Sequence, residues 1–297
     1  MKLRAQKRTL LKPVRANEGV RMAYRKALWA LLVKMHRDVL HAVEPVYREL
    51  PNIAMDDLQG ASEQELFDLM EEVAKEWREN FVSASKDIAK KFADGSMKAT
   101  DVAFKSALRD AGFSVKMTVD DAVQSVLDNL IEDNVDLIKS ISEDYLAEVA
   151  ELVRDSVREG RSMKALSERL GDMVDLDRIG RGQRLDESDD SLLARTQRHA
   201  DFIARNENNR ATSSIHKARQ KQFGITQAQW IHTAASVNPR PEHEDWDGEL
   251  YNVDEGMYSE VDEEAVWPGS IYNCGCCCLS VIPGMDDEEE ESEEEAS

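Results

Sequence analysis

The four cysteines of the chain lie within one stretch of five residues, at Cys274, Cys276, Cys277 and Cys278. A disulfide scaffold spreads its cysteines along the chain to join distant segments, so this clustering argues against one. Clustered thiols in a chain that begins with no secretion signal are typical of a reduced, cytosolic setting and of metal binding. The cluster is therefore the first place to look for chemistry.

Two thiolates at the spacing Cys-x-Cys can bind one tetrahedral zinc ion, and a histidine from an upstream turn can be the third ligand. His243 is the best candidate for that histidine. The fourth ligand is open between Cys278, His232 and Asp247. The alternative is that the cysteines are small buried apolar side chains on a core strand, which is common for free cysteine. Zinc, where it binds, is expected as a structural ion.

A dense acidic segment precedes the cysteines, with 11 carboxylates between Glu242 and Glu264. Paired carboxylates can hold magnesium or calcium, or act as acid and base. The spacing matches no EF-hand loop, and no Ser-His or Cys-His nucleophile arrangement is evident. A solvated acidic face is the favoured interpretation.

Basic residues gather at the start of the chain, where residues 1–50 carry 12 Lys or Arg and 4 acidic residues. Such an arm can bind the phosphate backbone of DNA or an acidic protein surface, and the second is favoured. It lacks the interleaved aromatic residues of a single-strand binder. The residues expected to bind a partner or DNA are Arg4, Lys7, Arg8, Lys12 and Arg15.

The 297 residues are 41% hydrophobic and 33% charged, enough apolar content for a core and too much charge for a membrane protein. The longest uninterrupted apolar run, 27–33, is far shorter than a membrane span. The net charge of −21 is unevenly placed, because residues 241–297 hold 20 of the 59 acidic residues and no Lys or Arg. A basic start and an acidic end indicate charged partners.

The elements that must position these residues are mostly helical. No proline occurs from residue 52 to 238, and apolar residues recur at helical spacing, as over 24–39 and 138–153. We expect helices over 62–93, 100–112, 119–131, 163–171 and 192–222. Ser162 is placed to cap the fourth of these, and Gly224 to stop the last. Residues 180–190 read as a polar linker.

After Trp230 the pattern changes to turns and short strand-like pieces at 229–232 and 271–282. The fold class is therefore predicted as mainly α, with a long-helix N-terminal region, a small α+β C-terminal module and a disordered acidic tail. The predicted parts are a basic arm and helix over 1–60, a helical region over 61–190, the module over 191–284 and the tail over 285–297.

The order of several short motifs resembles the phage Mu F-like head morphogenesis family. These motifs are Ala200–Glu207, Phe223-Gly224, Trp230, Arg240–His243, Asp247-Gly248, Pro268 and Asn273–Cys276, within a resemblance over about 135–284. The chain departs from the family pattern at three places. Asn206 replaces a usual Thr, Asn238 lies where an Asp is common, and Gly275 replaces an Arg between the cysteines. The first and third are expected to be helix-surface or loop changes.

The resemblance implies a minor head protein of a tailed bacteriophage that is not an enzyme. Such a protein associates with the portal protein inside the procapsid and acts in head assembly and in DNA packaging and ejection. Its implied partners are the portal protein, the major capsid or scaffold proteins and packaged DNA, with no membrane and no small-molecule substrate. Its implied location is the capsid interior of the virion, after assembly in the host cytoplasm.

Two alternatives come from other classes. A metal-dependent hydrolase such as a nuclease would use His243, the carboxylates and Asn273 as its catalytic set, with an open position on the metal. An acidic assembly chaperone or scaffold would act through the tail, residues 286–297. Both remain open on the residues alone.

Overall fold

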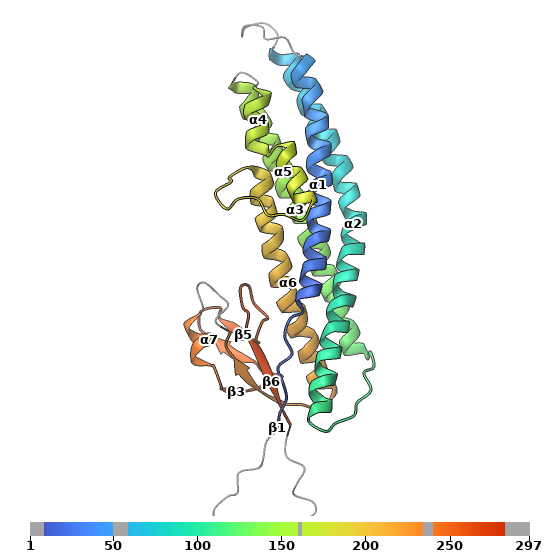
Figure 1. Cartoon of the computed structure of the whole chain (residues 1–297), viewed down its shortest axis with the longest axis vertical. Helices are drawn as coiled ribbons and strands as arrows, with labels where there is room; N and C mark the ends of the chain where they lie inside the picture. The colour runs from blue at the N-terminus through green and yellow to red at the C-terminus, as the bar shows by residue number, and fades with distance from the viewer. Residues whose placement is uncertain (1–8, 50–58, 160–161, 234–239, 283–297) are drawn as a thin grey trace, which may run out of the picture. The chain divides into compact units, whose positions relative to one another are not determined.

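The computed structural model describes residues 9–49, 59–159, 162–233 and 240–282 (Figure 1). Four long helices dominate the described chain: α1 (Glu18–Glu49), α2 (Gln59–Asp110), α3 (Asp121–Arg158) and α6 (Leu192–Gln222). The short helices are α4 (Met163–Leu170), α5 (Met173–Gly180) and α7 (Pro241–Asp245). The chain is 66% helical, which confirms the mainly α class. The acidic tail lies outside the described residues.

The chain forms two compact units, each made of separate stretches. The first unit contains residues 1–20, 93–130 and 206–297, and the second contains residues 21–92 and 131–205. The helices α2, α3 and α6 therefore each contribute residues to both units. This division by contact cuts across the four consecutive parts named above, which stay a prediction.

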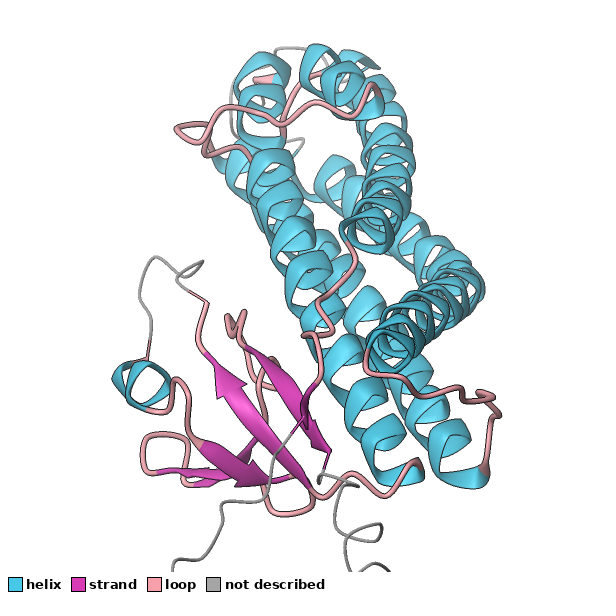
Figure 2. Cartoon of the chain, turned by 60° about the horizontal axis from the view of Figure 1, so that its bottom comes forward, coloured by secondary structure: helices cyan, strands magenta, loops and turns pink. Residues whose placement is uncertain are grey.

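The first unit holds the strands. A four-stranded sheet has the order β1-β6-β2-β3, from β1 (Thr9–Leu10), β6 (Cys277–Ile282), β2 (Gln227–Ile231) and β3 (Leu250–Asn252). All neighbouring pairs are antiparallel, with Trp230 opposite Cys278 and Leu10 opposite Val281. A separate hairpin pairs β4 (Met257–Ser259) with β5 (Glu264–Val266). Figure 2 shows α7 as the short helix beside these strands.

Two apolar clusters make the core of the first unit. One combines the cysteines with aromatic residues of the module, as Cys274, Cys276, Cys278, Trp230, Tyr251, Val253, Val266 and Ala228. The other joins chain segments far apart in sequence, as Leu11, Val14, Phe104, Ala107, Leu108 and Ile225. The start of the chain is thus part of the core on which the C-terminal module rests.

A buried arginine ties the elements of the first unit together. Arg219 on α6 is completely buried and donates from two nitrogens to both carboxylate oxygens of Asp101 on α2, each at 2.7 Å. It also donates to the Thr118 carbonyl oxygen and to the Gln222 side chain. A buried guanidinium needs this degree of pairing to offset its loss of water.

The core of the second unit contains a buried histidine that hydrogen-bonds to two other segments. His36 on α1 is completely buried, with Nδ1 hydrogen-bonded to the Tyr145 hydroxyl on α3 and Nε2 hydrogen-bonded to the Gly171 carbonyl oxygen, which lies between α4 and α5. The carbonyl can only accept, so Nε2 carries the proton and Nδ1 accepts from Tyr145. Burial lowers the pKa of His36 to about 4.

The structure confirms the helix over 192–222 and the Ser162 cap, whose hydroxyl accepts from the Ala165 N–H at 3.2 Å. Other predicted helix boundaries were wrong. The helices expected over 62–93 and 100–112 are one helix, α2, which runs through Gly95 and buries Ser96. Burial of this face outweighs the roughly 1 kcal/mol that glycine costs inside a helix.

The segments over 119–131 and 138–153 are likewise one helix, α3. The polar residue Asn134 that separates them is buried and accepts a hydrogen bond from the Tyr24 hydroxyl at 2.8 Å. A satisfied side chain of this kind is compatible with a helix interior. Helix α5 had no counterpart in the sequence analysis, although Asp172 caps it through the N–H groups of Val174 and Asp175.

Candidate metal centre

His243 is presented by α7, a helix of one turn with Pro241 at its first position. Its side chain is buried between two tryptophans. The imidazole stacks on Trp246 with ring centroids 5.3 Å apart and meets Trp230 edge-on at 5.0 Å. The aromatic packing fixes the ring and leaves Nδ1 facing the cysteine turn.

The turn before β6 presents Cys274 and Cys276. It is held by the neighbouring face of α6, because Asn206 Oδ1 accepts from the Asn273 N–H at 3.0 Å and Asn209 donates to the Cys274 carbonyl oxygen at 3.1 Å. The Gly269 N–H donates to the Cys274 sulfur at 3.2 Å. Gly269 has φ +81°, and a Cβ there would lie 3.1 Å from a backbone oxygen, so only glycine fits this approach.

The three side chains converge. His243 Nδ1 lies 3.5 Å from the Cys274 sulfur and 3.8 Å from the Cys276 sulfur. All three ligand atoms lie within 4.8 Å of one another. Zinc–sulfur bonds of about 2.3 Å and zinc–nitrogen bonds of about 2.0 Å give tetrahedral edges of about 3.5 Å between nitrogen and sulfur and about 3.8 Å between two sulfurs. The distances therefore fit the edges of a tetrahedral zinc site.

Two further observations bear on that fit. His243 Nε2 is buried without a hydrogen-bond partner in the described residues, so the observed hydrogen bonds do not fully satisfy this ring. The two thiols also differ in acidity. Hydrogen bonds from Cys274 and then His243 lower the pKa of Cys276 to about 4, whereas the hydrogen bond to Cys276 and burial raise the pKa of Cys274. A thiol that deprotonates easily, next to an imidazole, is the combination of donors that zinc prefers.

The three residues considered for the fourth ligand lie in different places. His232 Nδ1 is 3.7 Å from the Cys276 sulfur, at the edge of the group. Asp247 is exposed and accepts a hydrogen bond from the His232 N–H at 2.8 Å. Cys278 contacts neither His243 nor the other cysteines through any described hydrogen bond. Among the three, His232 alone touches a member of the converging set.

Cys278 instead belongs to a second buried cluster that the sequence analysis missed. Its sulfur lies 3.7 Å from His216 Nδ1 and accepts from Gln220 at 3.6 Å, both on α6. Gln220 also donates to Ser280 Oγ at 2.8 Å. Burial lowers the pKa of His216 to about 4 and raises that of Cys278 to about 11, so both groups are neutral near pH 7. The cluster fastens β6 to α6.

A few carboxylates of the acidic segment hold turns of the module, and most of the others are exposed. Glu242 accepts from the Ser259 hydroxyl at 2.7 Å and from the Glu260 N–H at 2.9 Å, and Asp262 pairs with Arg240 at 3.4 Å. Among the described residues, the group His243, Cys274 and Cys276 is the sole cluster with metal-ligand geometry. Glu242 and Asp262 therefore support turns of the module, and the exposed remainder agrees with a solvated acidic face.

The basic residues of the arm are partly described. Lys12 is exposed and pairs with Asp110 at the end of α2, at 2.7 Å. Arg15 is exposed, and its positive charge acts on the buried Cys277 thiol. Arg4, Lys7 and Arg8 lie outside the described residues.

The comparisons with known proteins agree with the motif order. The family model described as "Phage Mu protein F like protein" matches residues 147–279. This segment is Mu F-like. The match confirms the resemblance predicted from the sequence. The family is structural and not catalytic, which supports the prediction that the chain is not an enzyme.

A protein of Haemophilus influenzae (strain Rd), described as "Uncharacterized protein", is 24% identical over 286 residues. The alignment covers 95% of this chain, and the chain spans 57% of the length of that relative. No solved structure matches the chain. Within its described part, no helix combines the length and apolarity needed to cross a membrane.

The structure describes two of the three residues at which the chain departs from the family pattern. Asn206 was expected at the helix surface, and this was wrong: it is buried and accepts the hydrogen bond from Asn273 that holds the cysteine turn. Gly275 is exposed in that turn, as expected. Asn238 lies outside the described residues.

Proposed function

We propose that the protein is a minor head protein of a tailed bacteriophage, which associates with the portal protein inside the procapsid and acts in head assembly and in DNA packaging and ejection. The observation that carries this proposal is the Mu F-like match over residues 147–279. The proposed location is the capsid interior, reached from the host cytoplasm during assembly.

The proposed contacts with other head components lie in the basic start of the chain. Lys12 and Arg15 are exposed there and belong to the same arm as Arg4, Lys7 and Arg8. A basic arm is attracted to acidic protein surfaces and to DNA over a distance set by the salt concentration. The portal protein is the first proposed partner, followed by major capsid or scaffold proteins and packaged DNA.

The proposed role of the metal centre is structural. His243, Cys274 and Cys276 would hold one zinc ion, with His232 as the fourth ligand in preference to Cys278 or Asp247. These ligands come from α7, the turn before β6 and the end of β2, so one ion would fasten three short segments of a small module. Metal binding of this kind contributes directly to folding free energy.

The proposal is tested by co-expression with the portal protein of the same phage, followed by purification of procapsids. We expect the chain to copurify with portal-containing procapsids and to be depleted from procapsids that lack the portal. Charge reversal of Lys12 and Arg15 to Glu should weaken the association, whereas the same change at the exposed Lys98 and Lys105 should not. Equal incorporation with and without the portal would refute portal association.

A further inference from the structure

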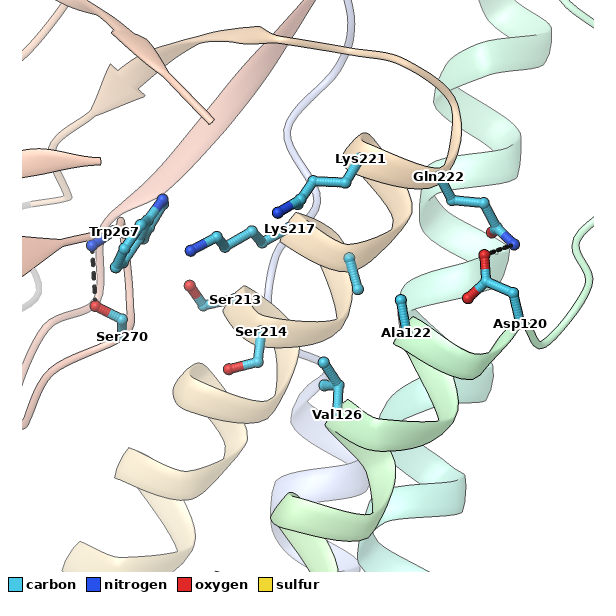
Figure 3. A pocket seen from close by; sticks show the side chains of 11 residues that line it. Asp120, Ala122, Val126, Ser213, Ser214, Lys217, Lys221, Gln222, Trp267 and Ser270 are labelled. Atoms are coloured by element: carbon cyan, nitrogen blue, oxygen red, sulfur yellow. Dashed lines mark hydrogen bonds between the residues drawn. The ribbon is translucent and has the colours of Figure 1, made fainter. Parts of the chain in front are cut away.

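A pocket of about 620 Å³ lies in the first unit, and none of His243, Cys274 and Cys276 lines it. Its walls come from α6, from the first turns of α3 and from the loop after β5 (Figure 3). The lining residues that matter here are Lys217, Lys221, Ala218, Val126, Ala122 and Trp267. The volume is in the range of small-ligand sites in proteins.

Lys217 is the cation at the centre of this pocket. Its ammonium nitrogen lies 3.0 Å from the centroid of the Trp267 ring, toward which it points in Figure 3. The residue is half-buried, and no carboxylate in the described part of the chain forms an ion pair with it. Burial lowers the pKa of Lys217 to about 8. An ammonium with an aromatic face but no directly paired carboxylate is only partly compensated for its loss of water.

The other two charged side chains that line the pocket have direct partners. Lys221 pairs with Asp254 at 2.6 Å. Asp120 accepts from the Gln222 side chain at 2.8 Å and from the Val123 N–H at 2.9 Å, where it caps α3. Lys217 therefore remains as the cation of the pocket without a direct ion pair in the described part of the chain, since Asp254 is held by Lys221 and acts on Lys217 only through its longer-range charge.

The rest of the pocket is largely apolar. Ala122 and Val126 on α3 and Ala218 on α6 line it, and the lysine stems add further carbon surface. Trp267 is fixed in place, because its Nε1 donates to the Val253 carbonyl oxygen at 2.9 Å and its backbone N–H donates to Ser270 Oγ at 3.0 Å. The walls are therefore formed before any ligand arrives.

We propose that this pocket binds a single carboxylate carried on an apolar body, with the carboxylate on Lys217 and the body between Val126, Ala218 and Trp267. One cation without a direct ion pair fits a monoanion better than a phosphate dianion, which would need a second such cation. The ligand is either a free carboxylic acid or an acidic side chain with apolar neighbours on another protein.

The test uses hexanoate with the purified full chain, measured by calorimetry and by NMR of the lysine side chains. Hexanoate should bind at least tenfold more tightly than hexanol, which lacks the charge, and than acetate, which lacks the body. Binding should raise the pKa of Lys217 from about 8 toward 10.5, because the carboxylate favours the ammonium form. Lys217→Met should abolish binding, Lys217→Arg should retain it, and Lys105→Met on the exposed face of α2 should have no effect.

The proposal is overturned if hexanol binds as well as hexanoate, or if Lys217→Met binds as the wild type does. Zero-length carbodiimide cross-linking in assembled particles then separates the two sources. An amide between Lys217 and an Asp or Glu of another protein indicates a side chain, whereas a copurifying small acid in native mass spectra indicates a free ligand. Hexanoate binding does not depend on the proposed head function, so either proposal can fail alone.

Discussion

Individual side chains decide whether the cysteine cluster is a zinc site. His243 and Cys276 belong to the converging set, whereas Cys278 contacts His216 and Gln220. We expect one zinc per chain in the wild type, loss of zinc in His243→Ala and Cys276→Ser, and retention in Cys278→Ser. Loss of the ion should lower the Tm, by roughly 2–4 °C for each 1 kcal/mol lost. Elemental mass spectrometry with thermal melts measures both quantities.

Zinc retained in Cys276→Ser would contradict the assignment, and zinc lost in Cys278→Ser would support Cys278 as the fourth ligand.

The metal ligands could be predicted from the sequence only in part. Alternation along a strand places Cys274, Cys276 and Cys278 on one side, and all three do join one apolar cluster. The strand begins only at Cys277, however, and the partner of Cys278 is His216, on a helix 62 residues away along the chain. No local pattern carries that information.

His36 makes the stability of the second unit depend on pH. Because its pKa falls from 6.5 to about 4 on folding, the unfolded chain takes up a proton at a higher pH than the folded one. Stability should therefore fall as the pH drops from 6.5 toward 4. Between pH 7 and pH 5, the wild type should lose about 2 kcal/mol more than His36→Gln, whose amide can make both hydrogen bonds without titrating.

Urea unfolding at the two pH values measures this difference. The exposed His199 provides the matched control, and His199→Gln should follow the wild type. An equal loss of stability in the wild type and His36→Gln would show that His36 carries no such linkage.

At the scale of elements, Arg219 holds α6 against α2 and the segment before α3. Lysine cannot form the two-pronged pairing with Asp101, so Arg219→Lys should destabilise the protein by at least about 2 kcal/mol. Arg195→Lys should change it by no more than about 0.5 kcal/mol, because Arg195 and its partner Glu148 are both solvent-exposed. Chemical unfolding compares the two variants, and equal effects would show that the burial of Arg219 adds nothing.

Helix existence was predictable at this scale, whereas helix length was not. Helix 192–222 was predicted with its correct ends, since apolar spacing and the stop at Gly224 are both local signals. Helices α2 and α3 each run on where the sequence predicted two separate helices. This continuity depends on tertiary contacts, such as that of Tyr24 with Asn134 in α3. Strand β1 has two residues and forms only because β6 is beside it, so nothing in its own sequence identifies it.

At the scale of the whole molecule, the Mu F-like segment shares its core with other parts of the chain. The core beneath its sheet uses Leu11, Val14 and Phe104, which lie outside residues 147–279. The first unit therefore needs three stretches of chain to close its core. A fragment of residues 191–284, the module expected from sequence, lacks two of them, and we expect it to show no cooperative thermal melt.

Two neighbouring leucines test the same expectation in the full chain. Leu11 is 2% exposed within the core, whereas Leu10 is 48% exposed on β1. Leu11→Ala should cost about 2–5 kcal/mol, because it leaves a cavity against α2, and Leu10→Ala should cost well under 1 kcal/mol. A fragment 191–284 that melts cooperatively, together with equal effects at Leu10 and Leu11, would show that the start of the chain only binds partners and does not build the fold.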